Sequence, residues 1–130
     1  MHRRWTLLSL FVVVAVLLLS AGPARANSIE QEGLVMGCFI DTPAYDTYRE
    51  NDCYLLGSEP STAAFKVLNI TEPSRYVIDW SVSTCTNPSF CTIPIRPNQN
   101  KTVSATVTDL YTGDQAVLSA TAHYIFDPGF

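Results

Sequence analysis

The four cysteines are the side chains whose number and spacing most directly predict chemistry. They are Cys38, Cys53, Cys85 and Cys91. An even number of cysteines in a small chain is typical of disulfides where the compartment is oxidising. We favour pairing between near neighbours in the sequence, which gives Cys38–Cys53 and Cys85–Cys91. A zinc site is the alternative, but the spacings are not C-x-x-C and His123 is the only histidine after residue 26.

His123 is also the candidate general base that a serine or cysteine nucleophile would need. It alternates with Ala122 and Tyr124 in an expected strand and therefore faces away from them. That position is typical of a surface or edge-strand histidine. The chain contains no glycine-rich phosphate loop, no H-E-x-x-H and no G-x-S-x-G sequence. We therefore expect neither an enzyme nor a bound cofactor.

Acidic side chains gather between the first two cysteines. They are Asp41, Asp46, Glu50 and Asp52. Such oxygen atoms are the ligands that calcium prefers, but their order does not fit an EF-hand and Arg49 lies among them. We predict solvated loop acids and no metal, and binding of a cation by the 41–52 loop stays open.

Three aromatic residues lie within the two segments that the expected disulfides close. Phe90 directly precedes Cys91, and Tyr45 and Tyr48 lie in the first segment. An aromatic side chain on a stiffened loop is a good binding anchor, because less conformational freedom is lost on binding. The outward residues of the expected strands are mostly Ser, Thr and Asp. We therefore expect a partner to contact Phe90, Tyr45 or Tyr48 and not a sheet face. The alternative is that these rings only cover the ends of the fold.

The charge of the chain is divided unevenly along its length. Three of the eight basic residues lie in the first 26 positions, and all twelve acidic residues lie beyond them. Residues 27–130 thus hold five basic and twelve acidic side chains, a net charge of −7. Such a surface repels phosphate backbones and anionic lipids, so we expect no nucleic-acid partner. A net negative charge of this kind usually serves solubility, and binding of a basic partner is the alternative explanation.

The N-terminus has the three parts of a secretion signal. Arg3 and Arg4 are followed by an apolar run over 5–19 and by the small-residue sequence Ala-Arg-Ala at 24–26. We predict a signal peptide over 1–26, cleaved before Asn27, and a secreted or periplasmic protein without a membrane anchor after cleavage. The alternative, an uncleaved anchor, needs about 20 apolar residues.

Residues 27–130 are expected to form one all-β domain. The clearest strand covers 76–82, where apolar residues alternate with others. Further strands are expected over 34–36, 61–70 and 92–96, followed by a hairpin of 103–108 and 116–125 around a turn at 110–114. Pro94 lacks a backbone donor and places 92–96 at a sheet edge. Nine residues should form most of the core: Phe65, Val67, Tyr76, Ile78, Trp80, Val103, Val107, Leu118 and Ala120. We read Cys38 to Cys53 as a polar loop and find no helical period.

The later strands resemble bacterial immunoglobulin-like and polycystic-kidney-disease-type domains over residues 61–126. The resemblance rests on Tyr76-Val-Ile-Asp-Trp80, on Val103 to Asp109 and on Val117 to Tyr124. It implies a small immunoglobulin-like β-sandwich. The chain departs from those families in having no cysteine in the terminal hairpin and in continuing after Trp80 with Ser-Val-Ser-Thr-Cys.

Two functions follow as hypotheses. The first is an exported, non-catalytic binding or structural module, whose partner would be an extracytoplasmic protein or a glycan. The second is an inhibitor of a secreted or periplasmic hydrolase that acts through the Cys85–Cys91 loop. An inhibitor should leave Phe90 exposed at a loop tip, and a structural module should leave it packed.

Overall fold

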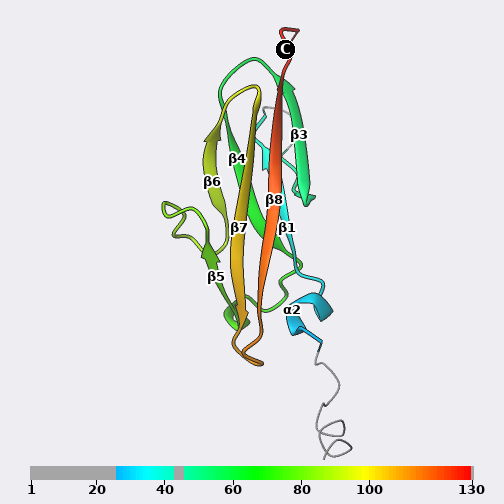
Figure 1. Ribbon diagram of the computed structural model, residues 1–130, viewed down its shortest axis with the longest axis vertical. Helices are drawn as coiled ribbons and strands as arrows, with labels where there is room; N and C mark the ends of the chain where they lie inside the picture. The colour runs from blue at the N-terminus through cyan, green and yellow to red at the C-terminus, as the bar shows by residue number, and fades with distance from the viewer. Residues whose placement is uncertain (1–25, 43–45, 130) are drawn as a thin grey trace, which may run out of the picture.

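The computed structural model describes residues 26–42 and 46–129, which form two four-stranded sheets that pack face to face (Figure 1). Residues 1–25 of the signal peptide expected over 1–26 lie outside the described residues, so the signal and the domain boundary at 26/27 stay predictions. Sheet A has the order β2-β1-β4-β6 and sheet B the order β3-β8-β7-β5. The strands of sheet A are β1 (Val35–Ile40), β2 (Arg49–Glu50), β4 (Ser61–Leu68) and β6 (Cys91–Ile95). Those of sheet B are β3 (Asp52–Gly57), β5 (Tyr76–Trp80), β7 (Gln99–Asp109) and β8 (Gln115–Phe126). The predicted all-β sandwich is confirmed.

The long hairpin of β7 and β8 is the centre of sheet B. Its antiparallel register runs from Gln99 opposite Tyr124 to Thr108 opposite Gln115. The predicted turn is present, and the Gly113 N–H donates to the Asp109 carbonyl at 2.7 Å. Gly113 has a φ of +78°, a conformation that glycine adopts without steric cost. The hairpin therefore ends in a tight turn of fixed shape.

Inward side chains of both sheets form one apolar core. Six of the nine predicted core residues are buried, and Ile78, Trp80 and Leu118 pack against them while partly exposed. The six buried ones are Phe65, Val67, Tyr76, Val103, Val107 and Ala120. As predicted, β6 with its Pro94 lies at the edge of sheet A.

The segment between the first two cysteines differs from the predicted loop. Cys38 lies within β1, and Cys53 lies within β3, whose residues alternate between exposed and buried up to Leu55. β3 pairs in parallel with β8, from Asp52 opposite Thr121 to Gly57 opposite Phe126. The strand was missed because the adjacent Leu55 and Leu56 obscure a period of two.

A short helix, α2 (Ser28–Gln31), precedes β1 and was also not expected. The side-chain oxygen of Asn27 accepts a hydrogen bond from the Ile29 N–H and caps it. A single turn is too short to show a helical period in the sequence. In the described part of the chain, no helix has the length and apolar character needed to cross a lipid bilayer.

Candidate functional site

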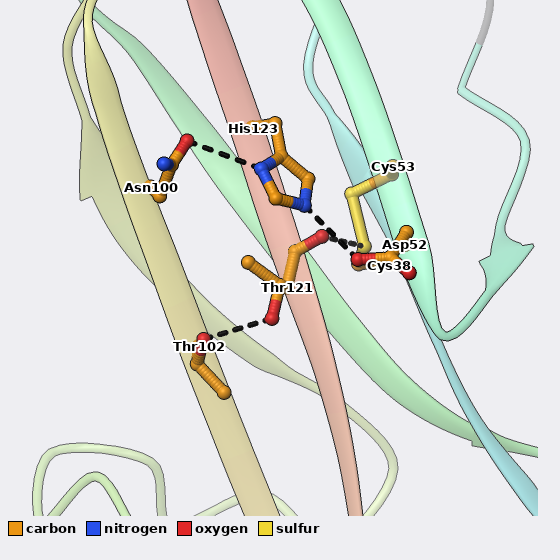
Figure 2. Close-up of a disulfide and its surroundings, with 7 residues drawn as sticks. All are labelled: Cys38, Asp52, Cys53, Asn100, Thr102, Thr121 and His123. Atoms are coloured by element: carbon orange, nitrogen blue, oxygen red, sulfur yellow. Dashed lines mark hydrogen bonds and ion pairs between the residues drawn. A yellow bond between two sulfur atoms is a disulfide. The ribbon is translucent and has the colours of Figure 1, made fainter.

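The two disulfides have the predicted pairing. Cys38–Cys53 joins β1 of sheet A to β3 of sheet B, with 5.7 Å between the Cα atoms (Figure 2). Cys85–Cys91 closes the loop between β5 and β6, with 5.1 Å between the Cα atoms. The described residues contain no free cysteine. The first bridge ties the two sheets together, and the second fixes a surface loop.

The Cys85–Cys91 loop is braced from inside as well as by its disulfide. The Trp80 side chain donates from Nε1 to the Asn87 carbonyl at 2.8 Å. The Asn87 side-chain oxygen accepts from the Ser89 N–H at 2.8 Å, which closes a local turn. Trp80 itself packs against the core, so the loop rests on the sandwich through a bulky, partly buried ring.

Phe90 lies on this braced loop with 45% of its surface exposed. Its neighbour Cys91 is buried, and begins β6. The backbone on one side of Phe90 is therefore held in sheet A, while the ring itself remains accessible. This combination of a held backbone and an accessible aromatic ring is what a binding anchor requires.

The aromatic residues of the first segment are placed differently. Tyr48 is half-buried and packs edge-to-face on Phe39 of β1, with the ring centres 4.8 Å apart. The Lys66 ammonium lies 5.8 Å from the centre of the Tyr48 ring. Burial raises the pKa of the Tyr48 hydroxyl. These contacts make Tyr48 part of the cover of sheet A, and Tyr45 lies outside the described residues.

His123 faces outward from β8, as predicted, but β8 is an inner strand of sheet B. Its ring stacks on Tyr54, with the centres 4.4 Å apart. Nε2 lies 3.0 Å from an Asp52 carboxylate oxygen, and Nδ1 lies 3.2 Å from the Asn100 side-chain oxygen (Figure 2). Both ring nitrogens thus have partners from the neighbouring strands, and no serine or cysteine nucleophile is among them.

The same outward row continues along the sheet. The hydroxyls of Thr121 and Thr102 lie 2.8 Å apart, and the Thr121 carbonyl oxygen lies 3.5 Å from Sγ of Cys38 (Figure 2). The Cys38 sulfur is in a disulfide and has no proton to donate, so this is a packing contact. The contact with the buried Cys38 of β1 lies on the inner side of sheet B, whereas the side-chain contacts of Asp52, His123, Asn100 and the two threonines form a ladder across β3, β8 and β7 on its outer face.

The acidic side chains of residues 41–52 do not converge on one site. Glu50 lies in β2 and Asp52 in β3, where it turns to His123. The Asp46 side-chain oxygen accepts from the Thr42 N–H at 3.3 Å. Among the described residues, no three His, Cys, Asp or Glu side chains are grouped so as to hold a metal ion.

Sequence reasoning missed a buried polar network at the β7–β8 turn. Asp109 is fully buried, and its carboxylate accepts two hydrogen bonds from Arg75, at 3.0 and 2.8 Å. It also accepts from the Ser28 hydroxyl at 2.7 Å and the Tyr111 N–H at 2.9 Å. The Arg75 hydrogen bonds hold the pKa of Asp109 well below its usual range, against the opposing effect of burial.

The Arg75 guanidinium is enclosed by aromatic rings as well. Its Cζ lies 5.3 Å from the centre of the Tyr76 ring and 5.0 Å from that of Tyr111. Nη1 reaches Glu32, just after α2, at 3.3 Å. In the sequence, the only local signs of this network are Arg75, which follows a Glu-Pro-Ser turn, and Asp109, which stands at the end of an expected strand. The network fixes α2, the 73–75 turn and the hairpin turn to one another, and its groups are all engaged structurally.

No family model, curated protein or solved structure matches this chain. The resemblance to bacterial immunoglobulin-like and polycystic-kidney-disease-type domains therefore stays a prediction.

Proposed function

We propose that this protein is an exported, non-catalytic binding module that contacts an extracytoplasmic protein through the Cys85–Cys91 loop. The observation that carries the proposal is the exposure of Phe90, 45% of whose surface is accessible on a loop braced by a disulfide and by Trp80. A module with a purely structural role would pack this ring against the sandwich. Export is supported by the signal-like N-terminus and by two disulfides, which are typical of oxidising compartments.

The binding proposal is tested by comparing three immobilised proteins, each spanning residues 27–130. They are the wild type, Phe90→Ala and Val117→Ala, and the last is a matched control because Val117 is 69% exposed on the outer face of β8. The source organism's exported fraction is passed over each. We expect a protein retained by the wild type and by Val117→Ala but lost with Phe90→Ala. Retention by all three at an equal level contradicts the loop as the contact.

A hydrolase inhibitor is the second candidate, and the position of the loop favours it. The loop leads directly into β6, an edge strand of sheet A, so an enzyme cleft could approach it without meeting a second strand. Titration against a panel of secreted serine, cysteine and metalloproteases tests this function. Stoichiometric inhibition that is lost in Phe90→Ala supports it, and full protease activity at a tenfold excess of the wild type contradicts it.

A further inference from the structure

Within the described residues, strand β3 has half of its backbone hydrogen-bonding groups without a strand partner. It lies at the end of sheet B, with β8 on one side only. The Thr121 N–H donates to the Asn51 carbonyl and the Asp127 N–H to the Gly57 carbonyl, so the odd-numbered residues of β3 face β8. Because backbone groups alternate in direction along a strand, those of Tyr54 and Leu56 face the open edge.

The side chains of the same two residues are exposed apolar groups. Tyr54 is 61% and Leu56 is 47% exposed, and the register places Leu56 beside Ile125, which is 48% exposed. These exposed apolar side chains correct the expectation that the outward residues of the strands are mostly Ser, Thr and Asp. The open edge of β3 is therefore bordered by an apolar strip on the outer face of sheet B.

A groove runs along the other side of this edge, between the two sheets. It has a volume of about 430 Å³ and is lined by apolar residues of β1 and β3, including Phe39, Ile40 and Leu55, and also by Thr42, Thr47 and Arg49. A strand added at the edge would direct alternate side chains to the apolar strip and to this groove. Both sides of an added strand thus have apolar contacts.

The edge of β3 also lacks the features that usually prevent strand addition. Its sequence, Asp-Cys-Tyr-Leu-Leu-Gly, contains no lysine and no proline. By contrast, the edge strand β6 contains Pro94, and the edge strand β2 is only two residues long. The fourth edge strand, β5, also contains neither residue, and β3, with six residues, is the longest of the four edge strands that the structure describes.

The charge around β3 selects the kind of strand that it accepts. Residues 41–59 contain five acids and one basic residue, Arg49. The acids are Asp41, Asp46, Glu50, Asp52 and Glu59, all at exposed positions. A second copy of this chain would bring the same acids to the edge, whereas a basic segment would complement them.

We propose that the open edge of β3 binds an extended, basic segment of a partner protein as an added strand of sheet B. Main-chain hydrogen bonds to Tyr54 and Leu56 give the pairing, and the acids give the preference for a basic sequence. This surface is separate from the Phe90 loop, because β3 and β5 lie at opposite edges of sheet B (Figure 1). The proposal therefore does not rest on the function proposed for that loop.

Fluorescence anisotropy with a labelled peptide of sequence Lys-Thr-Val-Thr-Val-Thr-Val-Lys tests the proposal. A matched peptide with glutamate in place of lysine tests the charge, and one with its central valine N-methylated removes a strand hydrogen bond. The basic peptide should bind residues 27–130 at least tenfold more tightly than either. Failure of the basic peptide to bind, or equal binding of the N-methylated peptide, overturns the proposal.

Substitutions in the protein locate the contact. Leu56→Lys should weaken binding of the basic peptide at least tenfold, and Val117→Lys should not, although both put one positive charge on an exposed apolar position of sheet B. Glu50→Gln with Glu59→Gln should reduce the preference for the basic peptide over the acidic one. Equal loss in Leu56→Lys and Val117→Lys overturns the assignment to β3. A dimer of the wild type that Leu56→Lys dissociates would replace the basic partner with a second copy.

Discussion

Arg75 holds both carboxylate oxygens of the buried Asp109, through Nε at 3.0 Å and Nη2 at 2.8 Å. The pair joins a turn before β5 to the end of β7, and through the Ser28 hydroxyl it also holds α2. A buried carboxylate without its cation would be left uncompensated, and removing one partner of such a pair is strongly destabilising. The stability of this end of the sandwich therefore depends on the charge of Asp109.

We predict that Asp109→Asn lowers the melting temperature by roughly 10 °C, because it removes the charge that Arg75 neutralises. The matched control is Asp79→Asn, which changes an exposed aspartate of the outer face of β5 and should leave the temperature within about 2 °C of the wild type. Circular dichroism at neutral pH measures both. Equal melting of the three proteins contradicts a stabilising pair.

The pH dependence follows from the lowered pKa of Asp109. In the unfolded chain this carboxyl titrates near pH 4, and in the folded protein below it, so the unfolded state binds the proton first as the pH falls. Its stabilising effect is complete above about pH 5 and is lost progressively as the pH falls from there toward the lowered pKa of the folded protein. Melting measured from pH 7 to pH 2 should fall more steeply for the wild type than for Asp109→Asn. Parallel curves would contradict this linkage.

Trp80 has two roles that two substitutions separate. Trp80→Ala removes a large ring packed on the core and should destabilise the protein by about 3 kcal/mol. Trp80→Phe keeps most of the packing but removes the hydrogen bond to the Asn87 carbonyl, and should cost about 1 kcal/mol. Urea unfolding measures both values. A Trp80→Ala protein as stable as its parent would show that the ring does not support the core.

The two disulfides should differ in their effect on stability. Replacing Cys38 and Cys53 with alanine opens a loop with a sequence separation of 15 and should cost about 3 kcal/mol. Replacing Cys85 and Cys91 opens a shorter loop and should cost about 2.5 kcal/mol. Peptide mapping without reduction confirms the pairs, and urea unfolding gives the energies. A fragment that links Cys38 or Cys53 to the second loop would contradict the pairing.

The processed protein should begin at Asn27. The prediction rests on the Ala-Arg-Ala sequence at 24–26. N-terminal sequencing of the protein isolated from the exported fraction of its source organism measures the start directly. Retention of Met1 would contradict cleavage. A start at Leu34 would show a second processing step. Such a step would remove Ser28 and Ile29, which are buried in the folded protein.

Sequence patterns predicted the parts of the fold that depend on near neighbours. Alternation in 76–82 and in the terminal hairpin predicts β5, which ends at Trp80, and β7 and β8, because a strand with one buried face must repeat every two residues. The cysteine spacing predicts both disulfides, because near neighbours in the sequence meet most easily.

The parts that sequence patterns missed depend on distant partners. β3 becomes a strand by pairing with residues 121–126, which no local pattern in Asp52–Gly57 indicates. Likewise, Arg75 and Asp109 are 34 positions apart, and a buried ion pair at that distance leaves no periodic signal. The exposed apolar side chains of β3 were missed along with the strand that carries them.

The parallel pairing of β3 with β8 also determines when the fold can be completed. β3 ends at Gly57, whereas β8, the strand with which it pairs in sheet B, spans Gln115–Phe126, much later in the sequence. A polypeptide emerging in order from its N-terminus cannot close this contact until β8 has been made, and such long-range contacts slow folding. Cys38 and Cys53 emerge much earlier, so oxidation can join them while sheet B is still incomplete. The late arrival of β8 thus leaves sheet B open while the intervening residues are made, which fits the export predicted from the N-terminal sequence.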